Sequence, residues 1–70
     1  MKQKNVKAGV RVEHKGTGVN PERIGALGTI LREGRRFPHV PHVQWDNSEF
    51  NVSSDGTYGS ENIEHLRIVK

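Results

Sequence analysis

The sequence predicts an all-β fold, in which five short strands curl into a small barrel. Apolar and polar residues alternate in several short stretches, which is the pattern of half-buried strands. Stretches rich in glycine, proline, asparagine and aspartate separate them, and such stretches form turns. No amphipathic helix of useful length is expected. Closing the sheet into a barrel would remove the unpaired edges that an open five-stranded sheet exposes.

Length and composition predict a single small domain. A chain of 70 residues buries only about 60% of its unfolded surface, and only 31% of its residues are apolar. The absence of cysteine excludes disulfides and thiolate metal sites and favours a reducing compartment, so a cytoplasmic location is expected. No apolar run reaches the roughly 20 residues that span a bilayer. The barrel is expected over residues 8–70, after a flexible basic arm over residues 1–7.

The first half of the chain predicts two strands joined by a long loop. Two valines alternate with charged residues over residues 10–14, which indicates the first strand. Residues 15–24 contain two glycines and an Asn-Pro pair and are expected to form a loop. Long ordered loops often carry binding surfaces. The second strand is expected over residues 27–33, with Gly28 at a bend or a close backbone approach.

The stretch from Val40 to Val52 predicts a β-hairpin. Val43 and Trp45 lie two apart before a polar turn at residues 46–48, and Phe50 and Val52 lie two apart after it. Pro38 and Pro41 lack a backbone donor, so firm pairing is expected only from residue 42 onward. The largest side chain of the protein, Trp45, is expected on the inner face.

The C-terminal part predicts a turn, a short helical piece and the last strand. Residues 53–60 consist of turn-forming residue types. Residues 60–64 are expected to form one 3-10 turn with Ser60 as its cap. Apolar residues alternate again over residues 65–70, which indicates the fifth strand.

Short motifs follow one another along the chain. They are G-V-R-V at residues 9–12, G-x-x-G-T-I at 25–30, V-Q-W-D-N at 43–47, Tyr58, and I-x-x-L-x-I-V at 63–69. Their order resembles the SH3-like small barrels, a set that includes KOW, Tudor and mind-bomb/HERC-type domains. The resemblance implies a five-stranded barrel with a long first loop and a 3-10 turn before the last strand. Members of this set mostly bind RNA, DNA, ribosomal components, modified peptide tails or proline-rich segments, so a non-catalytic binding module is expected.

One enzyme family shares such a barrel, the plasmid-borne type II dihydrofolate reductases, which build one active site at the centre of a tetramer. Their V-Q-I-Y signature is met here only by Val43 and Gln44, because Trp45 and Asp46 replace its last two residues. The sequence also contains no G-x-S-x-G elbow and no phosphate-binding P-loop. The chain is therefore expected not to be an enzyme, and an oligomeric reductase-like enzyme is the second alternative.

Basic loop residues predict a polyanionic partner. Eleven Lys and Arg against eight Asp and Glu give a formal charge of +3 and a pI near 9.7. Lys15 lies in the first long loop, and Arg35 and Arg36 lie at the tip of the connection between the second and third strands. If these loops meet at one end of the barrel, the three cations can contact phosphates of nucleic acid or of a nucleoprotein complex. The alternative is that they are solvated charges that maintain solubility.

The aromatic residues divide between the core and the surface. Trp45 and Phe50 are expected in the core, whereas Phe37 and Tyr58 lie in loops and are candidate contacts to a partner. A protein-interaction or self-assembly module is the first alternative function. The His39 and His42 pair has no third ligand, so neither a metal nor a cofactor is expected.

Overall fold

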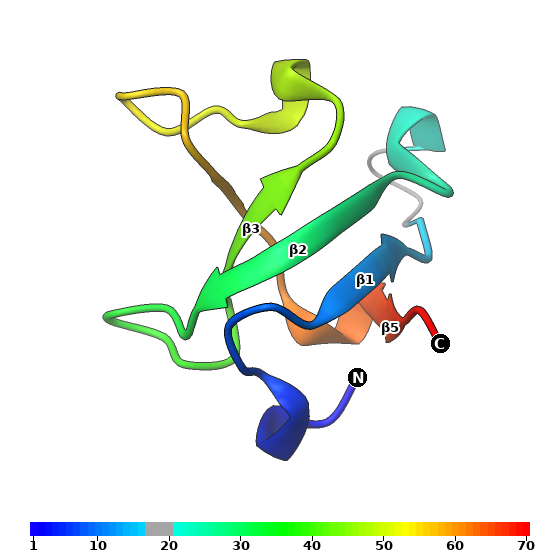
Figure 1. Cartoon of the computed structure of the whole chain (residues 1–70), viewed down its shortest axis with the longest axis vertical. Helices are drawn as coiled ribbons and strands as arrows, with labels where there is room; N and C mark the ends of the chain where they lie inside the picture. The colour runs from blue at the N-terminus through cyan, green and yellow to red at the C-terminus, as the bar shows by residue number, and fades with distance from the viewer. Residues whose placement is uncertain (17–20) are drawn as a thin grey trace.

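The structure is a computed structural model that describes residues 1–16 and 21–70. Five antiparallel strands form one sheet in the order β4-β3-β2-β1-β5, as predicted for an all-β chain (Figure 1). The helical pieces in the described residues are short 3-10 turns, and none of them has the length and apolar character needed to cross a membrane. The strands are β1 (Arg11–His14), β2 (Leu27–Arg32), β3 (His42–Trp45), β4 (Gly59–Ser60) and β5 (Leu66–Ile68). The 3-10 turns are η1 (Gln3–Asn5), η2 (Pro21–Arg23), η3 (Ser48–Phe50) and η4 (Ile63–His65).

The core lies on one face of the three central strands. Burial alternates along β1 and β3, because successive side chains of a strand point to opposite faces. Gly28 is opposite both Val12 and Trp45, and a side chain at position 28 would collide with Val43 and the indole. The close approach expected at Gly28 is therefore confirmed. The buried apolar residues are Val6, Val12, Ile30, Val43, Trp45 and Leu66.

The sheet is not closed into a continuous barrel. β4 and β5 are the two ends of the strand order, and no backbone pairing joins them in the described residues. The segment between them, residues 61–65, crosses the gap and bonds to other parts of the chain. Ile63 N–H donates to the carbonyl of His39 at 3.0 Å, and Lys15 N–H donates to the carbonyl of His65 at 2.7 Å. Covering segments thus replace part of the strand pairing that full closure would provide.

The predicted hairpin is correct in its first strand and wrong in its second. After Trp45 the chain enters η3, and Val52 is 67% exposed. The reason lies in Asn51, whose side-chain amide accepts a hydrogen bond from Trp45 N–H at 2.8 Å and donates one to the Trp45 carbonyl at 3.2 Å. One side chain therefore satisfies the backbone groups that a fourth strand would have paired.

The fourth strand lies instead at Gly59 and Ser60, inside the stretch expected to be all turn. It passes so close to η3 that a side chain at position 59 would collide with the carbonyl of Phe50, which explains the glycine. Ser60 consequently belongs to β4 and is not the cap of the next turn. Asn62 caps η4 by accepting a hydrogen bond from Glu64 N–H at 2.9 Å.

Residues 1–7, for which a flexible arm is expected, lie against the sheet. Val6 is 5% exposed and belongs to the core, because this apolar side chain finds a place beside the central strands. The amide of Gln3 donates to the carbonyl of Pro38 at 3.0 Å. η1 is therefore in contact with the connection between β2 and β3.

Candidate functional site

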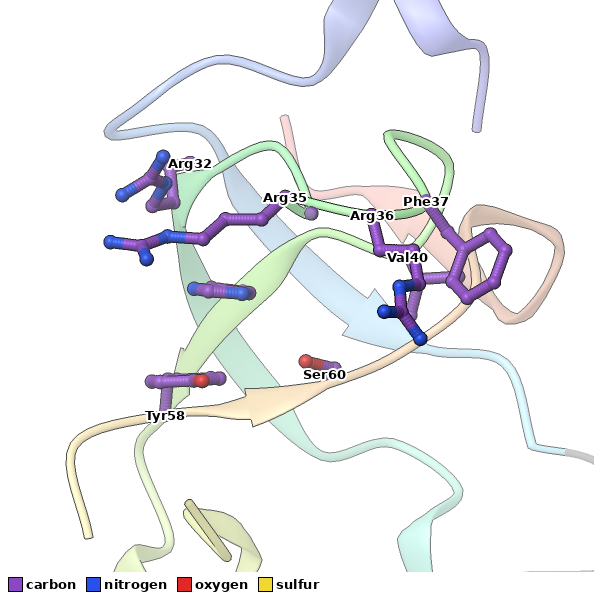
Figure 2. A pocket seen from close by; sticks show the side chains of 9 residues that line it. Arg32, Arg35, Arg36, Phe37, Val40, Tyr58 and Ser60 are labelled. Atoms are coloured by element: carbon purple, nitrogen blue, oxygen red, sulfur yellow. The ribbon is translucent and has the colours of Figure 1, made fainter. Parts of the chain in front are cut away.

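A depression of about 570 Å³ lies between the β2–β3 connection and β4 (Figure 2). We call it the arginine depression. Four of the five residues that the sequence analysis selects as contacts line it, and the structure therefore brings them together. It is lined by Arg32, Gly34, Arg35, Arg36, Phe37, Val40, His42, Tyr58 and Ser60.

The backbone of the β2–β3 connection positions the arginines. The pairing of β2 with β3 is irregular between Ile30 and Arg32, and the chain then folds back tightly. A side chain at Gly34 would collide with the backbone carbonyls of Phe37 and Val40, so only glycine fits there. Figure 2 shows Arg35 extending to the same side as Arg32, whereas Arg36 extends on the other side, near Phe37. The tight fold thus spreads cationic groups over the opening.

An aromatic stack forms the wall of the depression beneath these cations. The rings of His42 and Tyr58 are parallel within 8°, with their centroids 3.9 Å apart. Burial lowers the pKa of His42 below its ordinary value of 6.5, and the positive charges of Arg32 and Arg35 lower it further. The imidazole is therefore largely neutral at pH 7. Phe37 adds a ring that is 55% exposed.

The charged side chains that line the arginine depression are positive. Among the residues that the structure describes, three arginines line it and no Asp or Glu does. The ion pairs of arginine in the described residues lie elsewhere, between Arg11 and Asp46 at 2.7 Å and between Arg67 and Glu13 at 3.2 Å. Guanidinium groups without a protein carboxylate are ready to bind phosphate or carboxylate of a ligand in a forked geometry.

Lys15 lies in a different place. It borders a second depression, also of about 570 Å³, between the N-terminal residues and β5. We call this the lysine depression. Lys15 does not line the arginine depression, so the structure does not bring it together with Arg35 and Arg36 there. The lining residues are Met1, Lys2, Lys4, Asn5, Lys15, Leu66, Arg67, Ile68 and Lys70.

Five of the nine residues that line the arginine depression were not predicted from the sequence, and two of these, Arg32 and His42, carry a charged or an aromatic side chain. Arg32 is three residues before Arg35, and a charged residue at the end of a strand beside a basic loop tip is a signal that could have found it. His42 carries no such signal. It meets Tyr58 because β3 pairs with β4 in a register that sets His42 opposite Ser60.

A second polar cluster surrounds the carboxylate of Glu61. His14 is 1% exposed, and its Nε2 lies 2.7 Å from one carboxylate oxygen of Glu61, while His65 Nδ1 lies 2.7 Å from the other. Gly16 N–H donates to His14 Nδ1 at 2.8 Å, which assigns the proton of the imidazole to Nε2. Burial alone would raise the pKa of Glu61, but the hydrogen bonds from His65 and His14 outweigh it and lower that pKa.

The buried polar groups of His14 and Glu61 find their hydrogen-bond partners within the protein. No buried side-chain nitrogen or oxygen in residues 1–16 and 21–70 is left without a partner, and within those ranges no group of three acidic or histidine side chains is arranged to hold a metal. We therefore interpret the histidines and Glu61 as a structural network that ties β1 to the segment before β5.

Comparison with protein-family models, with curated proteins and with solved structures finds no match to this chain. Its function is therefore inferred from geometry and charge. The arginine depression offers three guanidinium groups, a neutral aromatic stack, an exposed phenyl ring and the hydroxyl groups of Tyr58 and Ser60. Such a set suits an anionic ligand that also carries flat rings.

Proposed function

We propose that this chain is a non-catalytic binding module that binds nucleic acid, alone or within a nucleoprotein complex, through the arginine depression. The observation that carries this proposal is the cluster of Arg32, Arg35 and Arg36 around one opening, which no Asp or Glu of residues 1–16 and 21–70 lines. Each phosphate that a basic side chain neutralises releases a counterion, which is the main source of sequence-independent affinity for nucleic acid.

The aromatic groups favour nucleic acid over a simple anion. Phe37 stands 55% exposed beside Arg36, where a base can stack on its ring. Tyr58 is held by its stack on His42, so it forms a rigid wall with its hydroxyl group available. A free inorganic anion would gain nothing from these rings, whereas a nucleotide presents both a phosphate and a base.

The fold supports the same proposal. We propose that the sheet belongs to the SH3-like barrels, in which the loops decide what the platform binds. Three features support this assignment: β1 lies between β2 and β5, a long connection joins β1 to β2, and η4 comes directly before β5. The arginine depression lies at the adjoining ends of β2 and β3, the connection between them, Tyr58 and the edge strand β4. Most of its lining residues belong to connections, which is where such a platform would carry its ligand.

The proposal is tested by fluorescence polarisation with labelled single-stranded and duplex oligonucleotides. Micromolar binding is expected at about 50 mM salt, and it should weaken steeply by about 200 mM as counterion release predicts. Replacing both Arg35 and Arg36 by Gln should weaken binding at low salt by at least about tenfold, because two phosphate contacts are lost.

A control variant with the same change in charge separates a site from a general charge effect. Lys7→Gln with Arg23→Gln removes two cations that line neither depression. It should bind nearly as well as the unchanged chain. Equal losses in the two double variants would show that only net charge matters. No binding to any oligonucleotide at low salt would remove the proposal and favour a protein-interaction module.

A further inference from the structure

The lysine depression is a second basic surface that the proposed function does not use. Its five basic side chains come from both ends of the chain and from the start of the first loop, and among the described residues no Asp or Glu side chain lines it. Only Arg67 among them is in an ion pair within the described residues, with Glu13. Taken together, the arginine and lysine depressions hold eight of the eleven lysines and arginines of the chain.

η1 lies between the two depressions and connects them. Lys2, Lys4 and Asn5 line the lysine depression, while the side chain of Gln3 donates to the carbonyl of Pro38, the residue after Phe37. η1 therefore borders the lysine depression and is hydrogen-bonded to the β2–β3 connection, whose neighbouring residues line the arginine depression. Figure 1 shows the two ends of the chain close together on one side, with η1 below the sheet.

We propose that the arginine and lysine depressions are two ends of one track for single-stranded nucleic acid. This inference rests on the proposed function and names its ligand more closely. A strand would place a base on Phe37 and phosphates beside Arg35 and Arg36, cross η1, and continue along Lys4 and Lys15.

A single strand fits this track better than a duplex. Duplex DNA is stiff over about 150 base pairs and keeps its bases stacked inside, so it cannot follow a path around η1 or offer a base to Phe37. A single strand bends freely and exposes its bases. Because the whole molecule measures only 27 × 26 × 21 Å, the track holds a short segment of a few nucleotides.

The dependence of binding on oligonucleotide length tests the track. Single strands of about 3 and about 12 nucleotides are compared by polarisation, since sites on small barrels cover roughly 4–16 nucleotides. Lys4→Gln with Lys15→Gln should leave the short strand bound as before. For the long strand, this double variant should make the negative slope of log K against log salt shallower by about 1.4, because each lost phosphate contact contributes about 0.7. The affinity for the long strand at low salt should fall by about fivefold to tenfold.

Matched variants make the outcome specific. Arg35→Gln with Arg36→Gln should weaken the short and the long strand alike, whereas Lys7→Gln with Arg23→Gln should change neither. If the short strand binds and the Lys4 and Lys15 variant keeps the full affinity and slope for the long strand, the track is wrong and the proposed function stands. Duplex binding as tight as that of the long single strand would also overturn it. If no strand binds at all, the proposed function itself fails.

Discussion

Glu61 receives hydrogen bonds from two histidines at 2.7 Å. The three arginines that line the arginine depression, in contrast, have no carboxylate partner in the described part of the chain. The first region lies partly inside the protein, where an unpaired charge would cost several kcal/mol, roughly 3–5. The second is exposed, so water solvates its charges. The comparison indicates that the paired cluster serves stability, and it supports the proposal that the unpaired arginines serve binding.

This difference makes the two regions separable by mutation. A change in the cluster of His14, Glu61 and His65 should alter the free energy of unfolding, and a change in the arginine depression should alter ligand affinity. Exposed substitutions usually change stability by less than about 0.5 kcal/mol, so the arginine variants are expected to stay folded. Each of the following predictions tests one side of this division.

The largest effect is expected for His14→Ala. This change leaves a cavity under the indole of Trp45 and removes hydrogen-bond partners from Glu61 and Gly16 N–H. We expect a loss of about 3 kcal/mol in the free energy of unfolding, measured by urea denaturation followed by tryptophan fluorescence. Lys15→Ala, at the exposed neighbouring residue, is the control and should lose less than about 0.5 kcal/mol. A loss below about 1 kcal/mol at His14 would contradict the structural role.

A smaller effect, and one that depends on pH, is expected for Glu61→Gln. Hydrogen bonds to a charged group contribute about 1.5–3 kcal/mol, and we expect a loss in this range at pH 7. Because the folded pKa of Glu61 lies below its ordinary value of 4.5, its stabilisation is complete above that value and disappears as the pH falls through the folded pKa.

The difference in unfolding free energy between the original chain and Glu61→Gln should therefore narrow as denaturation is repeated at successively lower pH. Asp46 and Asp55 also have lowered pKa values, so both proteins lose some stability in acid. Only the difference between them reports on Glu61. A difference that stays constant through the acid range would mean that the carboxylate charge does not stabilise the fold.

On the binding side, Arg35→Lys with Arg36→Lys tests whether the guanidinium geometry matters. Lysine keeps the positive charge, but it lacks the forked pair of guanidinium donors that binds a phosphate. We expect the affinity for a single strand to fall by about tenfold, equivalent to about 1.4 kcal/mol, with little change in the salt dependence. Unchanged affinity would mean that the depression provides charge alone.

The sequence predicts the central strands because their burial pattern is local. Val12, Val43 and Trp45 alternate with polar neighbours, and the structure buries all three. The fourth strand could not be placed in this way. Phe50 and Val52 have the spacing of a strand, but the amide of Asn51 takes over the backbone of Trp45, and no periodicity reports such a contact.

The candidate site was predictable only where its residues are neighbours in sequence. Arg35, Arg36 and Phe37 lie on one short connection, so any fold keeps them together. Whether Lys15 joins them depends on the path of the chain after β1, which no local pattern reports. The structure places Lys15 beside η1 and β5. The stack of His42 on Tyr58, sixteen residues later in the chain, depends on the register between β3 and β4, which is also non-local.

The smallest expected effect concerns that stack and the pH dependence of binding. Burial and the charges of Arg32 and Arg35 hold the pKa of His42 below 6.5 in the free protein. A bound phosphate offsets the arginine charges, so the pKa of His42 rises on binding and the complex takes up a proton. Affinity for a single strand should therefore increase by about threefold as the pH falls from about 7.5 to about 5.5 at constant ionic strength, since histidine titrates in this range.

His42→Phe keeps a flat ring against Tyr58 and cannot titrate, so its affinity should be nearly independent of pH over the same range. His39, which is exposed beside Phe37, is the other histidine near the opening, and His39→Gln is the control that should retain the pH dependence. If the pH dependence survives in His42→Phe and disappears in His39→Gln, the bound anion lies outside the wall formed by His42 and Tyr58. The ligand would then contact the tip of the β2–β3 connection instead of entering the depression.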